Sequence, residues 1–189
     1  MALKQSDRLS RDKWADAALM LLAREGVAAL TIERLANDLG VTKGSAYHHF
    51  RSREELVNLA LARWEHEATA AIIEQLSAIP SPENRLRAIL SASVGRDAEL
   101  GLEYRIISAP DEVVAPYTER VTIARLAFLE QIYLDFGLSA ARAAIWARTS
   151  YASYLGVQLL RHSRADDPVV ASVGPEYIDE LMRQLTPRD

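Results

Sequence analysis

The side chains best suited to chemistry form a short run between residues 43 and 50. In a helix, successive residues point about 100° apart, so Ala46 and Phe50 fall together and face inward. The outward face then holds Gly44, Ser45 and His48, with Tyr47 and His49 on its flanks. A helix that meets only solvent favours Glu, Lys, Gln and Ala, whereas this face carries a glycine, hydroxyls and two imidazoles. We therefore expect a binding partner to cover it.

Double-stranded DNA fits this combination of groups. The side chains that can hydrogen-bond to base edges in the major groove are Ser45 and His48. Those that can reach phosphates are Lys43, Tyr47 and His49. Gly44 lets another backbone come close, and free amides at the helix N-termini near Thr31 and Thr42 add anion sites.

Two short helices and a tight turn must position this face. Thr31 caps the first helix, which runs to Leu39, and Gly40 and Val41 form the turn before the second. A helix-turn-helix has this build, and its second helix enters the major groove. An ordinary helical hairpin of a bundle is the alternative, and the composition of the outward face argues against it.

The rest of the chain has frequent helix caps and stops and almost no strand signals. We predict an all-α fold of about nine helices, in which an N-terminal three-helix bundle with the helix-turn-helix continues into a larger C-terminal bundle. The predicted helices span residues 11–25, 31–39, 43–50, 52–76, 82–90, 102–107, 116–136, 140–162 and 175–185. We expect residues 1–53 to form a DNA-binding domain and residues 54–189 a ligand-sensing and dimerisation domain.

Charge is divided unevenly along the 189 residues. Residues 1–53 hold 9 basic and 6 acidic side chains, whereas residues 54–189 hold 13 and 20. A basic head on an acidic body suits a polyanion at the head only. The chain has no cysteine, no signal-like N-terminus and no uncharged apolar run long enough to span a membrane, so we expect a cytoplasmic protein without membrane contact.

The stretch from Thr31 to Leu56 resembles the DNA-binding domain of TetR-type transcriptional regulators. Its pattern Leu-Ala-x-x-Leu-Gly-Val-Thr-Lys-Gly-Ser-x-Tyr-His-His-Phe keeps residue types and spacing over both helices and the turn. The resemblance implies phosphate contacts from Thr31, Tyr47 and Arg53. It implies base or backbone contacts from Thr42, Lys43, Gly44, Ser45, His48 and His49. Two departures are Ala46, where a larger aliphatic residue is usual, and Arg53, where lysine is common.

The resemblance also implies a homodimeric repressor that leaves a palindromic operator when a small effector binds the helical body. Aromatic and polar residues of the body give candidate ligand contacts: Tyr104, Arg105, Phe128, Trp146, Tyr151 and Gln158. The last two long helices have more apolar surface than one protomer is expected to cover, although a deeper intramolecular core is the rival explanation. The candidate dimer contacts are Trp146, Tyr154, Leu155, Leu159, Ile178, Leu181, Met182 and Leu185.

Other functions are less favoured by the sequence. His48 and His49 point about 100° apart, so one metal ion cannot readily use both, and residues 65–67 lack the partner of a helical zinc pair. The chain has no Gly-x-Ser-x-Gly and no phosphate-binding glycine loop, and nothing fixes Glu103, Arg105 or His162 in a catalytic geometry. We therefore expect no enzyme activity, metal or cofactor. A DNA-binding protein that senses no ligand and acts through protein partners remains open.

Overall fold

The computed structural model describes residues 10–92, 102–163 and 174–188, and all regular structure in these ranges is helical. The α-helices are α1 (Arg11–Glu25), α2 (Ile32–Asp38), α3 (Lys43–His49), α4 (Arg53–Glu65), α5 (Ala71–Ser77), α6 (Pro82–Ala92), α8 (Leu102–Ile107), α9 (Ala115–Asp135), α10 (Ala140–Ser163) and α12 (Pro175–Leu185). If α4, the π-helical turn His66–Ala70 and α5 count as one rod, the described residues form nine helices, which confirms the predicted class.

Hydroxyl caps set the starts of the first four helices. Ser10, Thr31, Thr42 and Ser52 each accept a hydrogen bond from the backbone amide three residues later, at 3.1–3.3 Å. These caps satisfy amides that have no partner inside the helix. Between α2 and α3, Gly40 takes a φ of 65°, a conformation that side chains rarely adopt, and so allows the tight turn.

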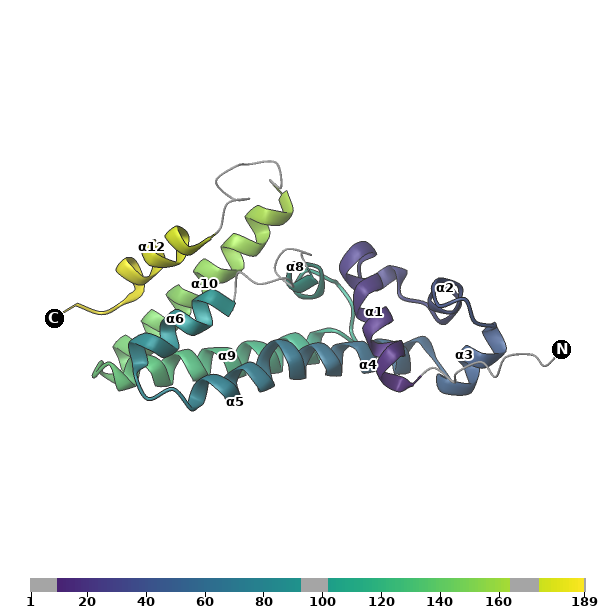
Figure 1. Ribbon diagram of the computed structural model, residues 1–189, viewed down its shortest axis with the longest axis horizontal. Coiled ribbons are helices and arrows are strands. Elements are labelled where there is room, and N and C mark those ends of the chain that lie inside the picture. Colours follow the sequence, from purple (N-terminus) through teal and green to yellow (C-terminus); the bar gives the residue numbers. More distant parts are fainter. Residues whose placement is uncertain (1–9, 93–101, 164–173, 189) are drawn as a thin grey trace.

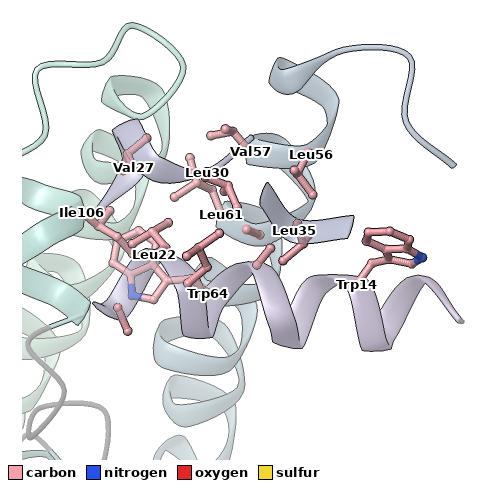
Figure 2. Close-up of a cluster of buried hydrophobic side chains, with 14 of the residues drawn as sticks. Trp14, Leu22, Val27, Leu30, Leu35, Leu56, Val57, Leu61, Trp64 and Ile106 are labelled. Carbon is pink, nitrogen blue, oxygen red and sulfur yellow. The ribbon is translucent and has the colours of Figure 1, made fainter. Parts of the chain in front are cut away.

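The N-terminal bundle has a continuous apolar core (Figure 2). Trp14, Leu22, Leu35 and Leu56 are fully buried in it. The same core takes in residues of α4 and α8, including Trp64, Leu102 and Ile106. The first three helices therefore pack directly against α4 and α8 and are not joined to the body by a linker alone.

The rod that begins at α4 runs along the length of the molecule from the N-terminal bundle into the body (Figure 1). Our predicted single helix over residues 52–76 is correct in extent and wrong in one detail. Residues 66–70 form a π-helical turn, and the backbone on both sides stays right-handed helical. Such turns frequently mark functional sites, because they leave backbone carbonyls free for other partners.

The body is built on the hairpin of α9 and α10, with α6 and α12 packed beside it (Figure 1). The fully buried Tyr133 ties three segments together, because its hydroxyl lies 2.6 Å from Ser150 Oγ and donates to the Leu185 carbonyl at 2.9 Å. Arg87 of α6 pairs with Asp179 of α12 at 2.6 Å. In the part of the chain that is described, no helix is both long and apolar enough to cross a membrane.

Candidate DNA-binding face and ligand pocket

Helix α3 has the orientation that the sequence predicts. Ala46 and Phe50 are fully buried, and the Phe50 ring meets the Trp14 ring edge-on at 5.3 Å between centroids. The exposed positions of α3 are Lys43, Gly44, Ser45, Tyr47 and His48. A Cβ placed on Gly44 would meet only Thr42 Oγ1, at 4.0 Å, so packing within the protein does not require a glycine here. The missing side chain instead leaves space on the outer surface of α3. The polar face of α3 is thus presented to a partner.

The two threonines serve first as helix caps. Thr31 Oγ1 accepts from the Arg34 amide at 3.1 Å, and Thr42 Oγ1 accepts from the Ser45 amide at 3.2 Å. Both side chains remain accessible at the rim of the α3 face. A hydroxyl in this position keeps its proton for another acceptor, such as a phosphate oxygen.

Glu33 lies on the same face, and the sequence interpretation gave it no role. The Tyr47 hydroxyl donates to its carboxylate at 2.8 Å, and Lys43 Nζ lies 4.0 Å away. The hydrogen bond from Tyr47 lowers the pKa of Glu33, and the same bond raises the pKa of Tyr47. The sequence feature that could have indicated this role is the position of Glu33 in the first turn of α2, the helix before α3. Two groups predicted to reach phosphates are therefore held by an internal anion.

The two adjacent histidines differ in their surroundings. His48 is exposed, whereas His49 is partly buried, with its ring 5.7 Å from the Trp14 ring. His49 thus helps to seat α3 on α1, in addition to the DNA contact predicted for it. Among the described residues, no three His, Cys, Asp or Glu side chains lie close enough to bind a metal ion together.

Arg53 has partners within the protein that the sequence did not predict. Its guanidinium donates to the carbonyls of Leu30 at 3.1 Å and Val27 at 2.9 Å, and to the Asp111 carboxylate at 3.2 Å. The resemblance implied a phosphate contact, but in the structure this side chain joins the N-terminal bundle to the segment between α8 and α9. Planar donors on three sides explain why an arginine suits this site better than a lysine.

A pocket opens in the body between the rod, α6, α8, α9 and α10. Its apolar wall includes Trp64, Ile72, Ile73, Ile89, Phe128 and Leu129. Its polar and aromatic side chains are Thr69, Glu103, Arg125, Ser150, Tyr151 and Tyr154. The combination of an apolar wall with a few convergent polar groups is typical of small-molecule sites.

Two of the six predicted ligand residues line this pocket, Phe128 and Tyr151. The other four do not. Tyr104 stacks on His162 at 4.3 Å, and the Trp146 ring lies 5.6 Å from that of Tyr133, in the core of the body. Arg105 follows Tyr104 on α8, and Gln158 is buried at 1% exposure in α10. Aromatic character alone did not separate core from pocket, because both use the same residue types.

An ion pair that the sequence interpretation missed lies in the pocket wall. Arg125 donates to both carboxylate oxygens of Glu103, to Thr69 Oγ1 at 3.0 Å and to the Ala68 carbonyl at 3.0 Å. The last two acceptors belong to the π-helical turn. Burial acts to lower the pKa of Arg125, but the adjacent Glu103 carboxylate outweighs it and raises that pKa. The sequence feature that could have indicated this ion pair is Arg125 itself, a single arginine among the apolar residues in the middle of α9.

Most of the predicted dimer contacts are buried or partly buried within one protomer. Ile178, Met182 and Leu185 are 6%, 4% and 5% exposed within one protomer, because α12 packs its apolar face on the body. Trp146, Leu155 and Leu181 pack against the same core, and Tyr154 lines the pocket. Of the eight, only Leu159 is well exposed, at 47%. The rival explanation, a deeper intramolecular core, accounts for most of this apolar surface.

Comparison with known proteins gives a match for the N-terminal region. Residues 15–60 match the model of bacterial regulatory proteins of the tetR family. The transcriptional regulator SrpR of Pseudomonas putida is 26% identical over 116 residues, 54% of this chain and 54% of that protein. The repressor KstR2 of Mycobacterium tuberculosis strain H37Rv is 30% identical over 83 residues, 44% of this chain and 42% of that protein. The matches thus span about half the length of these relatives.

Solved structures resemble the chain over its whole length. A TetR transcriptional regulator from Legionella pneumophila superposes with a TM-score of 0.72 at 16% identity, covering 97% of both chains. FadR from Bacillus subtilis in complex with stearoyl-CoA has a TM-score of 0.69 at 12% identity, covering 92% of this chain and 97% of that one. These matches show a shared fold. Over residues 15–60, the chain is thus similar to the tetR family of bacterial regulatory proteins.

Proposed function

We propose that the chain is a sequence-specific, DNA-binding transcriptional regulator. It acts as a homodimeric repressor that leaves a palindromic operator when a small molecule enters the body pocket. The observation that carries this proposal is the α3 face, where Gly44, Ser45 and His48 point outward on a helix seated by Ala46 and Phe50. Residues 1–53 form the DNA-binding domain in this proposal, and residues 54–189 form the sensing and dimerisation domain.

The division of roles on the α3 face follows from side-chain chemistry. Ser45 and His48 read base edges, while Lys43, Tyr47 and the Thr31 hydroxyl contact phosphates. Thr42, Gly44 and His49 border the same contact. The relatives named as regulators and repressors support this proposal. The family model supports it as well, since its match over residues 15–60 includes α3.

The pocket gives the regulator its sensor. FadR was solved with stearoyl-CoA, which supports an effector site in a body of this fold. A ligand shifts the balance between two dimer arrangements only if it binds them unequally, and the coupling is reciprocal. Helix α8 links the sites: Glu103 faces the pocket, Ile106 packs in the N-terminal core, and Asp111 after the helix holds Arg53.

The dimer contact is proposed on the outward face of α10. Ile145, Leu159 and Leu160 are 65%, 47% and 49% exposed there, and Ala152 and Gly156 lie between them on that face at helical spacing. A Cβ on Gly156 would meet nothing within 4 Å, so the protomer itself does not require this glycine, although glycine weakens a helix. A second copy of α10 can cross closely at Ala152 and Gly156, because these residues are small. The two copies would then form an isologous contact.

Selection of the purified protein on a random duplex library tests the function. We expect an enriched palindrome whose half-sites lie near one or a few helical turns apart, because two-fold protein symmetry requires it. Enrichment of a non-palindromic site would contradict the dimer, and absence of any enrichment would contradict sequence-specific binding.

Variants of the α3 face then separate phosphate contacts from base contacts. Lys43→Ala should weaken binding to all sequences and reduce the slope of log affinity against log salt by about 0.9. Ser45→Ala and His48→Ala should instead change the preferred bases while leaving that slope nearly unchanged. Titration of the selected site and a scrambled duplex at several salt concentrations measures both, and equal losses on all sequences would contradict the assignment.

A further inference from the structure

The two charged side chains of the body pocket form an ion pair with each other. Glu103 and Arg125 are the charged side chains among the lining residues of the described chain, and their side chains are 6% and 13% exposed. Arg125 directs two of its hydrogen bonds to the two oxygens of Glu103. The pocket wall therefore carries an anion and a cation that neutralise each other at contact distance.

Two further donors of Arg125 are also occupied. Its Nε donates to Thr69 Oγ1 at 3.0 Å, and Nη2 donates in addition to the Ala68 carbonyl at 3.0 Å. Four acceptors thus surround a guanidinium that has five N–H groups. The Cζ atom of Arg125 also lies 5.9 Å from the centroid of the Trp64 ring and 5.6 Å from that of the Tyr154 ring, so aromatic faces cover the guanidinium. This arrangement holds the arginine away from a ligand rather than presenting it.

A charged ligand has to break this pair. A carboxylate that takes Arg125 leaves Glu103 buried without its partner, and a cation that takes Glu103 leaves Arg125 in the same state. Removal of one partner from a buried ion pair is strongly unfavourable, because the remaining charge is neither solvated nor neutralised. A neutral ligand leaves the pair intact and exchanges water for the apolar wall.

We propose that the pocket selects an uncharged ligand that is mainly hydrocarbon. The inference rests on the proposed role of this pocket as the effector site. Trp64, Phe128 and the isoleucines supply apolar contact. Tyr151, whose hydroxyl lies at the long distance of 3.4 Å from Thr122 Oγ1, can give a hydrogen bond to a hydroxyl or carbonyl of the ligand. Glu103 acts as the group that excludes anions by keeping Arg125 occupied.

A matched series of probes with a ten-carbon chain tests the selection: 1-decanol below its solubility limit, and decanoate and decyltrimethylammonium below their micelle concentrations. Binding to the full chain is measured by titration calorimetry and by the rise in melting temperature that a ligand of the native state produces. We expect decanol to bind at least ten-fold more tightly than either ion. Decanoate or the ammonium compound binding as tightly as decanol would overturn the proposal while leaving the pocket as an effector site.

The variant Glu103→Gln should weaken or remove the selection against decanoate if the ion pair is its cause. The amide keeps the shape of the side chain but removes the negative charge that occupies Arg125. We expect decanoate affinity to rise at least ten-fold and decanol affinity to change less than three-fold. Glu130→Gln is the matched control, because Glu130 pairs with Arg148 outside the pocket at 3.2 Å. An unchanged decanoate affinity in folded Glu103→Gln would contradict the proposal.

Two further measurements keep the outcomes distinct. Ile73→Trp narrows the pocket, so it should reduce decanol affinity at least ten-fold if decanol binds there. If Glu103→Gln fails to fold, as judged by its helical circular dichroism, the probe series on the unmodified chain still decides the charge selection. Failure of all three probes to bind would contradict the pocket itself, and the charge selection with it.

Discussion

Glu33 places a negative charge among side chains that are expected to meet the DNA backbone. Its carboxylate accepts from the Tyr47 hydroxyl at 2.8 Å and lies 4.0 Å from Lys43 Nζ. A phosphate that approaches Tyr47 and Lys43 therefore meets a like charge and has to replace an existing partner. Glu33 therefore orients the two side chains, and it lowers the non-specific affinity for duplex DNA.

The variant Glu33→Gln should raise the affinity for a random duplex about three- to ten-fold at low salt, because the repulsion between the Glu33 carboxylate and the phosphates is lost. The slope of log affinity against log salt should also steepen, because one negative charge no longer offsets the cationic side chains at the phosphate backbone. Fluorescence anisotropy titrations at several salt concentrations measure both quantities. Glu83→Gln on α6 is the control with the same net charge, and equal behaviour of the two variants would contradict this role for Glu33.

At the scale of the element, Arg53 and Asp111 connect the first turn of α4 to the segment before α9. Asp111 also accepts from the Val113 amide at 2.9 Å, which fixes the start of that segment. The pair is partly exposed, with side chains 38% and 19% accessible, so solvent screening limits its strength.

A double-mutant cycle with Arg53→Ala and Asp111→Ala should give a coupling free energy of about 0.5 to 1.5 kcal/mol, as expected for residues in contact. Arg53→Lys should recover little, because a lysine cannot reach two carbonyls and a carboxylate together. Urea unfolding measures each free energy. The exposed pair Arg24 and Asp38 is the comparison, and additive effects at Arg53 and Asp111 would show that the connection has no energetic weight.

Arg85 and Asp135 join α6 to α9 in the body. The side chain of Arg85 is 10% exposed and that of Asp135 is 34% exposed. The hydrogen bond from Arg85, with a second from Gln131, lowers the pKa of Asp135 below its ordinary value of 3.8. The folded state thus favours the charged carboxyl. Its stabilisation is complete above pH 3.8 and is lost as the pH falls through the lowered pKa.

Asp135→Asn should lower the free energy of unfolding at pH 7 by about 1 to 2 kcal/mol, a value reduced for solvent screening. The difference between the variant and the unmodified chain should shrink as the pH is taken below 3.8, where the native carboxyl is protonated as well. Thermal unfolding across pH measures this. Asp179→Asn breaks a more exposed pair and should cost less, and a pH-independent difference for Asp135→Asn would contradict the assignment.

At the scale of the whole molecule, the outward face of α10 is the proposed dimer contact. Gly156→Glu places a charge at the proposed crossing point without any clash inside the protomer, because a Cβ there meets open space. We expect sedimentation to show a monomer with unchanged helical circular dichroism, and operator affinity to fall because two half-sites are no longer held together. Ala62→Glu, at an exposed position of α4, is the control, and a dimer that persists in Gly156→Glu would contradict this interface.

The sequence alone determined the elements and the orientation of α3. Hydroxyl caps, glycine stops and apolar spacing are local signals, so the helix limits and the burial of Ala46 and Phe50 follow from short stretches of chain. The same local order carried the family resemblance, since the helix-turn-helix is one continuous segment.

Only the tertiary structure decided which distant residues meet. Glu103 and Arg125 are 22 residues apart, and Arg53 and Asp111 are 58 apart, so no periodicity pairs them. The apolar face of α12 gave the same sequence pattern for an intramolecular core as for a dimer contact, and the packing assigns Ile178, Met182 and Leu185 to the core. Hydrophobic burial is non-directional, so the pattern shows that a face is covered, and the fold alone shows what covers it.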